Sequence, residues 1–135
     1  THFSIEGASA PPLPDVIPPI CIGASGEKVG LPLAGRHADI WNGSGRASDE
    51  DWRRKLDILH NAASDAGRDP AQIEISQTIE HALPETDAQS QELLERLAHK
   101  ASLGITYFVM DFGNPLTTDH ISRFVEQVKQ PLIRG

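Results

Sequence analysis

Residues 18–28, which read PPICIGASGEK, predict a short buried strand that runs directly into a glycine-rich bend. Two prolines end any regular structure ahead of the strand, because proline has no N–H group and fixes φ. Residues 20–22 are apolar on both faces, as expected for a parallel strand that is covered on both sides. Gly23 and Gly26 then allow backbone conformations closed to other residues and a close approach by another group.

The bend itself is a candidate anion site. Small residues ahead of a helix leave backbone N–H groups pointing outward, and such groups attract a phosphate. The spacing matches neither the dinucleotide fingerprint nor the P-loop, so the bend alone favours a plain turn. Pro32 is tolerated only in a first helical turn, so we expect the helix to begin near Leu31. An anion would then rest mainly on loop N–H groups, with less help from the helix dipole.

Composition narrows the classes of protein. A chain of 135 residues with 39% hydrophobic residues suits one domain with a core. The formal charge of −7, without a basic run, argues against a nucleic-acid partner. We see no signal peptide and no segment that could cross a bilayer, so we expect no membrane partner. The single cysteine, Cys21, lies in the predicted buried strand, which favours an inert core thiol in a reducing cytoplasm.

The chain divides into an arm and a domain. Residues 1–17 predict an extended N-terminal arm, because residues 8–19 hold five prolines. The domain is expected over residues 18–135. The chain begins at Thr1 and its single methionine is Met110, so we expect it to be a piece of something longer.

Three further strand–helix units follow the first. The second strand covers residues 38–42, and Ser48 is the expected N-cap of a helix that ends at Gly67. The third strand is marked by isoleucines that alternate with polar residues, and the fourth by an apolar run that we expect to be buried. In the third strand, Ile73, Ile75 and Ile79 lie on one face and Glu74, Ser76 and Thr78 on the other. The fourth strand covers residues 105–112, and its apolar run is 107–110.

Strand and helix alternate four times, which predicts an α/β fold with parallel strands and right-handed crossovers. Four βα units form either a small open sheet or half of an eight-fold barrel. Composition does not choose between these two.

Four sequence segments, in their order and spacing, resemble one known family. They are PPICIGASGEK at 18–28, LPLAGRHADIWN at 31–42, AGRDP at 66–70 and ITYFVMDFG at 105–113. Together they resemble the C-terminal half of the luciferase-like monooxygenase superfamily, most closely its branch of probable oxidoreductases that use coenzyme F-420. The resemblance implies a TIM (β/α)8 barrel, of which this chain supplies strands five to eight as a half-barrel.

The resemblance also implies a function. The chain would be the C-terminal fragment of a flavin- or F-420-dependent oxidoreductase, with FMN as the alternative cofactor. It would contribute the cofactor-phosphate and substrate side of the barrel mouth. Several reaction-centre residues would come from the other half, so we assign no catalytic residue and expect this chain alone to be inactive. The cofactor-binding residues that it implies are Gly23, Ala24, Ser25, Gly26, Lys28, Trp41, Asn42 and Gly43.

Each candidate has a structural alternative. The amide of Asn42 could bond a ribityl hydroxyl or a substrate, or could bond its own backbone as in many turns. Trp41 could line the pocket or pack against the covering helices. Glu80 and His81 end the third strand, where substrate contacts are common, although an exposed loop pair is the simpler interpretation. Asp111 could point into the mouth or cap its loop.

We expect no metal, because no set of His, Cys and carboxylate residues has metal-ligand spacing. Four strands without closure leave two open edges, so the expected partner is the missing half-barrel or a second copy in a homodimer. Two other functions remain open. One is a non-catalytic half-barrel that self-associates as a scaffold or binding module. The other is a phosphate-binding open sheet that resembles flavodoxins, which strand order would distinguish.

Overall fold

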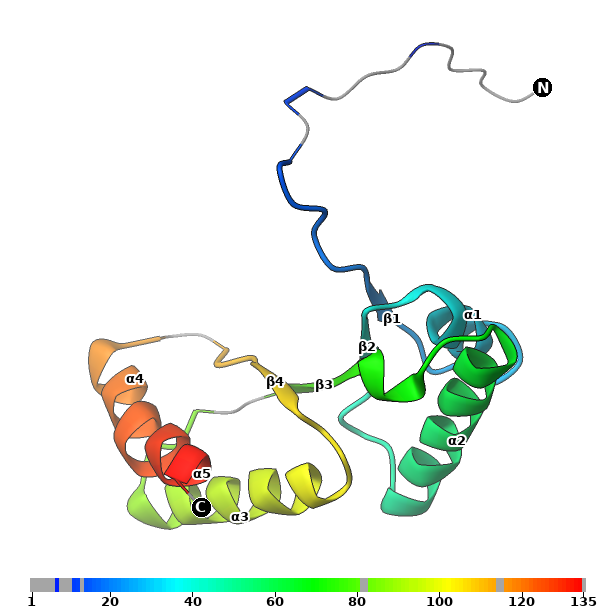
Figure 1. The fold of residues 1–135 in the computed structure, drawn as a ribbon. Helices are drawn as coiled ribbons and strands as arrows, with labels where there is room; N and C mark the ends of the chain where they lie inside the picture. The colour runs from blue at the N-terminus through cyan, green and yellow to red at the C-terminus, as the bar shows by residue number, and fades with distance from the viewer. Residues whose placement is uncertain (1–6, 8–10, 13, 81–82, 114–115, 135) are drawn as a thin grey trace, which may run out of the picture.

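The computed structural model describes residues 7, 11–12, 14–80, 83–113 and 116–134. Four strands alternate with helices along this part of the chain (Figure 1). The elements are β1 (Cys21–Gly23), α1 (Gly30–His37), β2 (Ile40–Gly43), α2 (Asp49–Asp65), the 3-10 helix η1 (Pro70–Gln72), β3 (Glu74–Ile79), α3 (Asp87–Ser102), β4 (Tyr107–Met110), α4 (Thr118–Phe124), the π-helix η2 (Val125–Lys129) and α5 (Gln130–Arg134).

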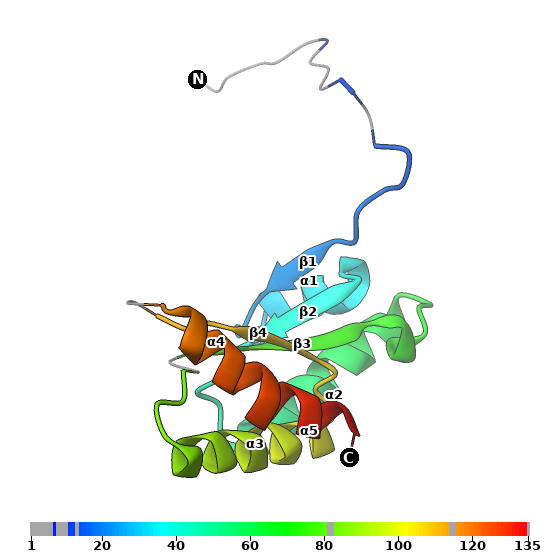
Figure 2. The same cartoon turned by 90° about the vertical axis from the view of Figure 1, so that its left-hand side faces the viewer.

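The four strands form one parallel sheet in the order β1-β2-β3-β4. This confirms the predicted α/β fold with four βα units and parallel strands. The sequential order differs from the reversed order of flavodoxin-like sheets, so the flavodoxin-like prediction is wrong. Figures 1 and 2 show the helices together on one side of the curved sheet. We call the other side of the sheet its concave face.

Two apolar clusters fill the space between the sheet and its helices. The larger one joins β2 and β3 to α1 and α2 around Trp41, and the smaller one joins β3 to α3, α4 and η2 around Leu97. Each fully buried large side chain contributes roughly 1.5–3 kcal/mol relative to exposure. The helices are therefore held to the sheet by side chains of one strand face only.

Local capping sets the helix ends much as predicted. The Ser48 hydroxyl accepts a hydrogen bond from the Asp51 N–H, and Gly67 follows α2 with φ +73°. Helix α1 begins at Gly30, one residue before the predicted start. The carbonyl groups at its C-terminal end find a hydrogen-bond donor that is remote in sequence. The Arg68 guanidinium donates to the C=O groups of Gly35 and Ala38.

Three expectations about individual residues are wrong. Tyr107 and Val109 are 45% and 39% exposed, because they lie on the concave face, where no helix packs. The opening strand is not covered on both sides as predicted: Ile20 is 52% exposed and Cys21 is exposed, because β1 is an outer strand and its concave face is uncovered. Gly23 and Gly26 do not have positive φ, and a Cβ on either would meet no atom closer than 4.0 Å.

Most of the predicted N-terminal arm lies outside the described residues. The part from residue 14 to β1 has no helix or strand, and it extends away from the sheet (Figure 1). In the described part of the chain, every helix is too short or too polar to cross a membrane.

Candidate functional site

A hollow of about 300 Å³ lies where β1, β2 and β3 end. The carboxyl ends of parallel strands meet at one edge of a sheet, so three loops that are distant in sequence converge there. We call this the rim hollow. Its lining residues are Gly23, Ala24, Ser25, Asn42, Gly43, Ser44, Gly45, Thr78 and Glu80.

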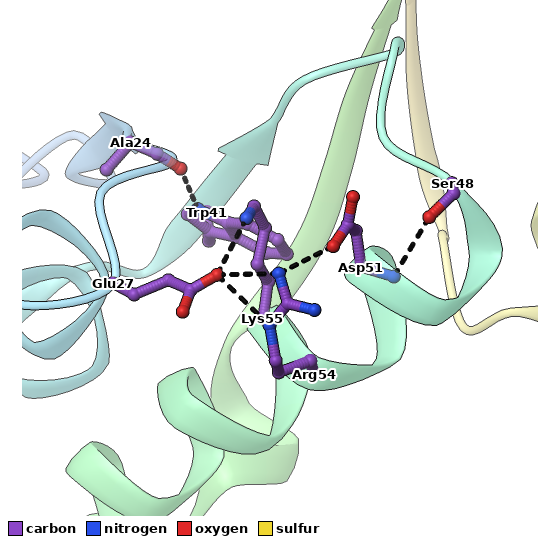
Figure 3. A network of polar contacts seen from close by, with 7 residues as sticks. All are labelled: Ala24, Glu27, Trp41, Ser48, Asp51, Arg54 and Lys55. Carbon is purple, nitrogen blue, oxygen red and sulfur yellow. Dashed lines mark hydrogen bonds and ion pairs between the residues drawn. The ribbon is translucent and has the colours of Figure 1, made fainter.

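The loop after β1 is anchored at two points, as Figure 3 shows. The indole N–H of Trp41 donates to the Ala24 carbonyl at 2.8 Å. Farther along, one carboxylate oxygen of Glu27 accepts from Arg54 at 3.0 Å and from Lys55 at 3.1 Å. Hydrogen bonds from Arg54 and then Lys55 lower the pKa of the Glu27 carboxyl. The loop is therefore fixed to β2 and α2 through its carbonyl and side-chain groups.

Three N–H groups of the same loop remain available. The register of β1 on β2 directs the Ala24 N–H to the Asn42 carbonyl, whereas within the described residues the backbone N–H groups of 25–27 donate to no protein acceptor. Uncompensated backbone N–H groups in a short loop form a favourable environment for an anion. The loop thus has the donors that a phosphate needs, beside the rim hollow.

The carboxamide of Asn42 is held by two hydroxyl groups of β3. Its Nδ2 donates to Ser76 Oγ at 2.9 Å, and its Oδ1 accepts from Thr78 Oγ1 at 3.3 Å. Ser76 is 1% exposed although it lies on the concave face beside Asn42. The amide is thus bonded to neighbouring side chains rather than to its own backbone, and it keeps one N–H and one oxygen lone pair for a ligand.

Trp41 does not line the rim hollow. Its side chain is fully buried and stacks on Trp52 in the larger apolar cluster. Gly43 is required by the same packing, because a Cβ there would lie 2.4 Å from Cζ3 of Trp52. These two predicted residues support the rim from beneath, and Gly43 also forms part of its surface.

Glu80 and Asp111 lie in different settings at the strand ends. Glu80 lines the rim hollow and forms an ion pair with Arg46 at 2.8 Å. Asp111 caps its own loop, since its Oδ1 accepts from the Gly113 N–H at 3.0 Å. His81 lies outside the described residues.

The rim hollow therefore brings together six of the residues singled out from the sequence. They are Gly23, Ala24, Ser25, Asn42, Gly43 and Glu80. Gly26, Lys28, Trp41 and Asp111 do not line it.

Sequence reasoning missed Ser44, Gly45 and Thr78 as lining residues. The polar face of β3 was the available signal for Thr78. Buried Gln77 was missed too: its Nε2 donates to the Ser44 carbonyl at 3.1 Å and so holds the loop after β2. Over the described residues, no three His, Cys, Asp or Glu side chains gather as metal ligands would.

Comparison with known proteins identifies the class. Residues 1–128 match the family model of the luciferase-like monooxygenases, so the chain belongs to that family. No curated protein matches the chain.

Many solved chains resemble the fold, among them two F420-dependent enzymes. The first is an F420-dependent secondary alcohol dehydrogenase in complex with an F420-acetone adduct, with a TM-score of 0.78, 17% identity, and coverage of 99% of this chain and 54% of that one. The second is the coenzyme F420 dependent tetrahydromethanopterin reductase from Methanopyrus kandleri, with a TM-score of 0.64, 12% identity, and coverage of 84% and 51%. At these identities the likeness concerns the fold. The chain spans about half the length of each structure, and its four βα units match about half of a luciferase-like barrel chain.

Proposed function

We propose that this chain forms strands five to eight of a luciferase-like oxidoreductase that uses F-420, and that it holds the phosphate end of that cofactor. The observation that supports this most directly is the pairing of the rim hollow with the unbonded N–H groups of residues 25–27. Family membership and the two F420-dependent structural neighbours favour F-420. FMN remains the alternative, because it also carries a phosphate on its ribityl chain.

The residues present fit such a group. The N–H groups of 25–27 would donate to the phosphate oxygens, and Lys28, exposed in the same loop, would add long-range attraction. The remaining N–H of Asn42, oriented by Ser76 and Thr78, would donate to a hydroxyl of the cofactor chain. When bound, F-420 would supply the hydride chemistry, while the protein supplies binding and orientation.

The substrate side would lie farther along the strand ends. Glu80 lines the rim hollow beside Thr78, so a small substrate above the cofactor would reach it. We retain His81 as a proposed substrate contact, since it follows Glu80 in sequence. Asp111 would hold its loop through Oδ1, which accepts from the Gly113 N–H, and would leave Oδ2 to accept from a substrate.

The concave face needs a cover for this function. Its exposed side chains include Cys21, Tyr107 and Val109, which are apolar enough to favour burial. In a complete barrel the remaining strands would cover them and would supply the catalytic residues. The same exposed side chains also favour a second candidate function, a non-catalytic half-barrel that self-associates through this face.

Titration of the purified protein with F-420 and, separately, with FMN tests the proposal. Ser25→Asp places a carboxylate beside the N–H groups and should weaken cofactor binding by about tenfold or more, the equivalent of one lost charge-assisted hydrogen bond. Ser122→Asp, on the exposed surface of α4, is the matched control and should leave binding unchanged. A folded protein that binds neither cofactor would refute the proposal.

A further inference from the structure

A second hollow, of about 220 Å³, adjoins the rim hollow. The two share Gly45, Thr78 and Glu80, so one depression continues into the other. Beyond these three, the second hollow is lined by Arg46, Ile79, Arg96 and Lys100. Its far wall is therefore helix α3, which does not contribute to the rim hollow. We call it the basic hollow.

Positive charge exceeds negative charge in this hollow. Glu80 is the one carboxylate among its lining residues, and it is paired with Arg46. Arg96 and Lys100 are four residues apart on α3, where like charges destabilise a helix. Within the described part of the chain, neither of them forms an ion pair.

The environment of Lys100 shows the same imbalance. Burial and then the nearby charge of Arg96 lower the pKa of its ammonium group, while Asp49 acts in the opposite direction. The Asp49 carboxylate is itself bonded to His99 at 2.8 Å, on the neighbouring position of α3. The ammonium group of Lys100 is thus half-buried beside the Arg96 cation, and the carboxylate that offsets its charge, Asp49, does not bond to it directly.

Such an arrangement is unfavourable unless an anion completes it. Lys100, which is half-buried, loses solvation, and the exposed Arg96 beside it repels its charge. A bound oxyanion would remove both costs, because a guanidinium and an ammonium are strong donors to phosphate and carboxylate oxygens.

We infer that the basic hollow binds an oxyanion, a phosphate or carboxylate group, between Arg96 and Lys100 on one side and Arg46 on the other. The anion has two possible sources. It is either a free anion or the acidic end of a ligand whose remainder occupies the rim hollow, since Gly45 and Thr78 line both.

The test is titration of the purified protein with inorganic phosphate at constant ionic strength, followed by amide NMR. We expect saturable shifts at Gly45, Arg96 and Lys100. Arg96→Gln and Lys100→Gln should each weaken phosphate binding about tenfold, the loss expected for one charge-assisted hydrogen bond. Lys129→Gln removes an exposed cation elsewhere and should have no effect. No saturation, unchanged binding in both variants, or shifts confined to residues 24–27 would overturn the inference.

Repeating the titration with saturating F-420 separates the two sources. Displacement of phosphate that depends on Arg96 would assign the hollow to the acidic end of the cofactor. Unchanged phosphate affinity would assign it to a free anion. If F-420 does not bind at all, the proposed cofactor role fails, while the phosphate titration still decides the basic hollow.

Discussion

Trp41 and Trp52 stack on each other, with ring centroids 4.9 Å apart and ring planes inclined by 27°. The pair joins β2 to α2 inside the larger apolar cluster. Each ring also donates its indole N–H to a backbone carbonyl, Trp41 to Ala24 and Trp52 to Leu103. Only the first of these bonds reaches the loop beside the rim hollow, so the core and the candidate site are coupled through Trp41.

Trp41→Phe is expected to lower both stability and cofactor affinity. It keeps an aromatic ring but removes the N–H that holds Ala24, at a cost of about 1–3 kcal/mol. Trp52→Phe is the matched control, because it loses a similar bond away from the rim. Urea unfolding should show a loss in both variants, and F-420 titration a loss only in Trp41→Phe. Equal affinity in the two variants would contradict the coupling.

Gly43→Ala is expected to destabilise the fold. The new Cβ would lie 2.4 Å from Cζ3 of Trp52, so the indole stack would have to move, at a cost of about 1–3 kcal/mol. Gly23→Ala has its nearest atom at 4.0 Å and should stay within about 0.5 kcal/mol of the original protein. Thermal unfolding of the two variants distinguishes these outcomes, and similar melting temperatures would show that the stack adapts.

The ion pairs of Glu27 should make stability depend on pH. Hydrogen bonds from Arg54 and then Lys55 lower its folded-state pKa from the ordinary 4.5. A lowered pKa adds stability that is fully present above the unfolded value and is lost as the pH falls through the folded value. Glu27→Gln should therefore be slightly less stable than the original near neutral pH, and the difference should vanish in acid. The effect is small because the group is exposed.

Urea unfolding at a series of pH values measures this difference. Glu126→Gln removes an exposed carboxylate on η2 and serves as the control, with no difference expected at any pH. A Glu27→Gln difference that persists in acid would point to a packing role instead of an ionic one.

Ser76→Ala should disorder the carboxamide of Asn42. The buried hydroxyl accepts from Asn42 Nδ2, so its removal leaves a partly buried donor unpaired, at about 1–3 kcal/mol. The side-chain NH2 resonances of Asn42 should lose their dispersion, which NMR detects directly. Ser122→Ala on the surface of α4 should leave these resonances in place. Unchanged Asn42 signals in Ser76→Ala would mean that Thr78 alone orients the amide.

Val109→Lys tests whether the concave face mediates self-association. A charge on this exposed strand position should reduce the mass measured by light scattering without lowering the unfolding temperature. Ile133→Lys changes an even more exposed apolar residue on α5 and should leave the mass unchanged. The reverse pattern would place the contact on the helices.

The alternation of strand and helix could be predicted because local signals mark it. The Ser48 hydroxyl caps a helix by accepting from an N–H only three residues away, and Gly67 allows the positive φ that ends the same helix. Both lie where predicted. The burial of residues 107–110 could not be predicted, since an apolar run does not reveal what packs against each face. Phe108 packs toward the helices, while Tyr107 faces the uncovered side.

In the candidate site, too, some residues could be predicted from the sequence and others could not. Gly23, Asn42 and Glu80 could be grouped in advance, because parallel strands end at a common edge. Arg96 and Lys100 could not, since residues in the middle and last turns of a helix have no positional rule that places them at a cavity. Trp41 was singled out for its position, but stacking on Trp52 determined where its side chain lies.

The outer strands of the sheet are only three and four residues long, at β1 and β4. An incoming chain that paired with either edge would gain few main-chain hydrogen bonds, so strand addition to a fibril would be weakly favoured. Burial of the exposed side chains on its concave face would contribute more to such an encounter than these short edges.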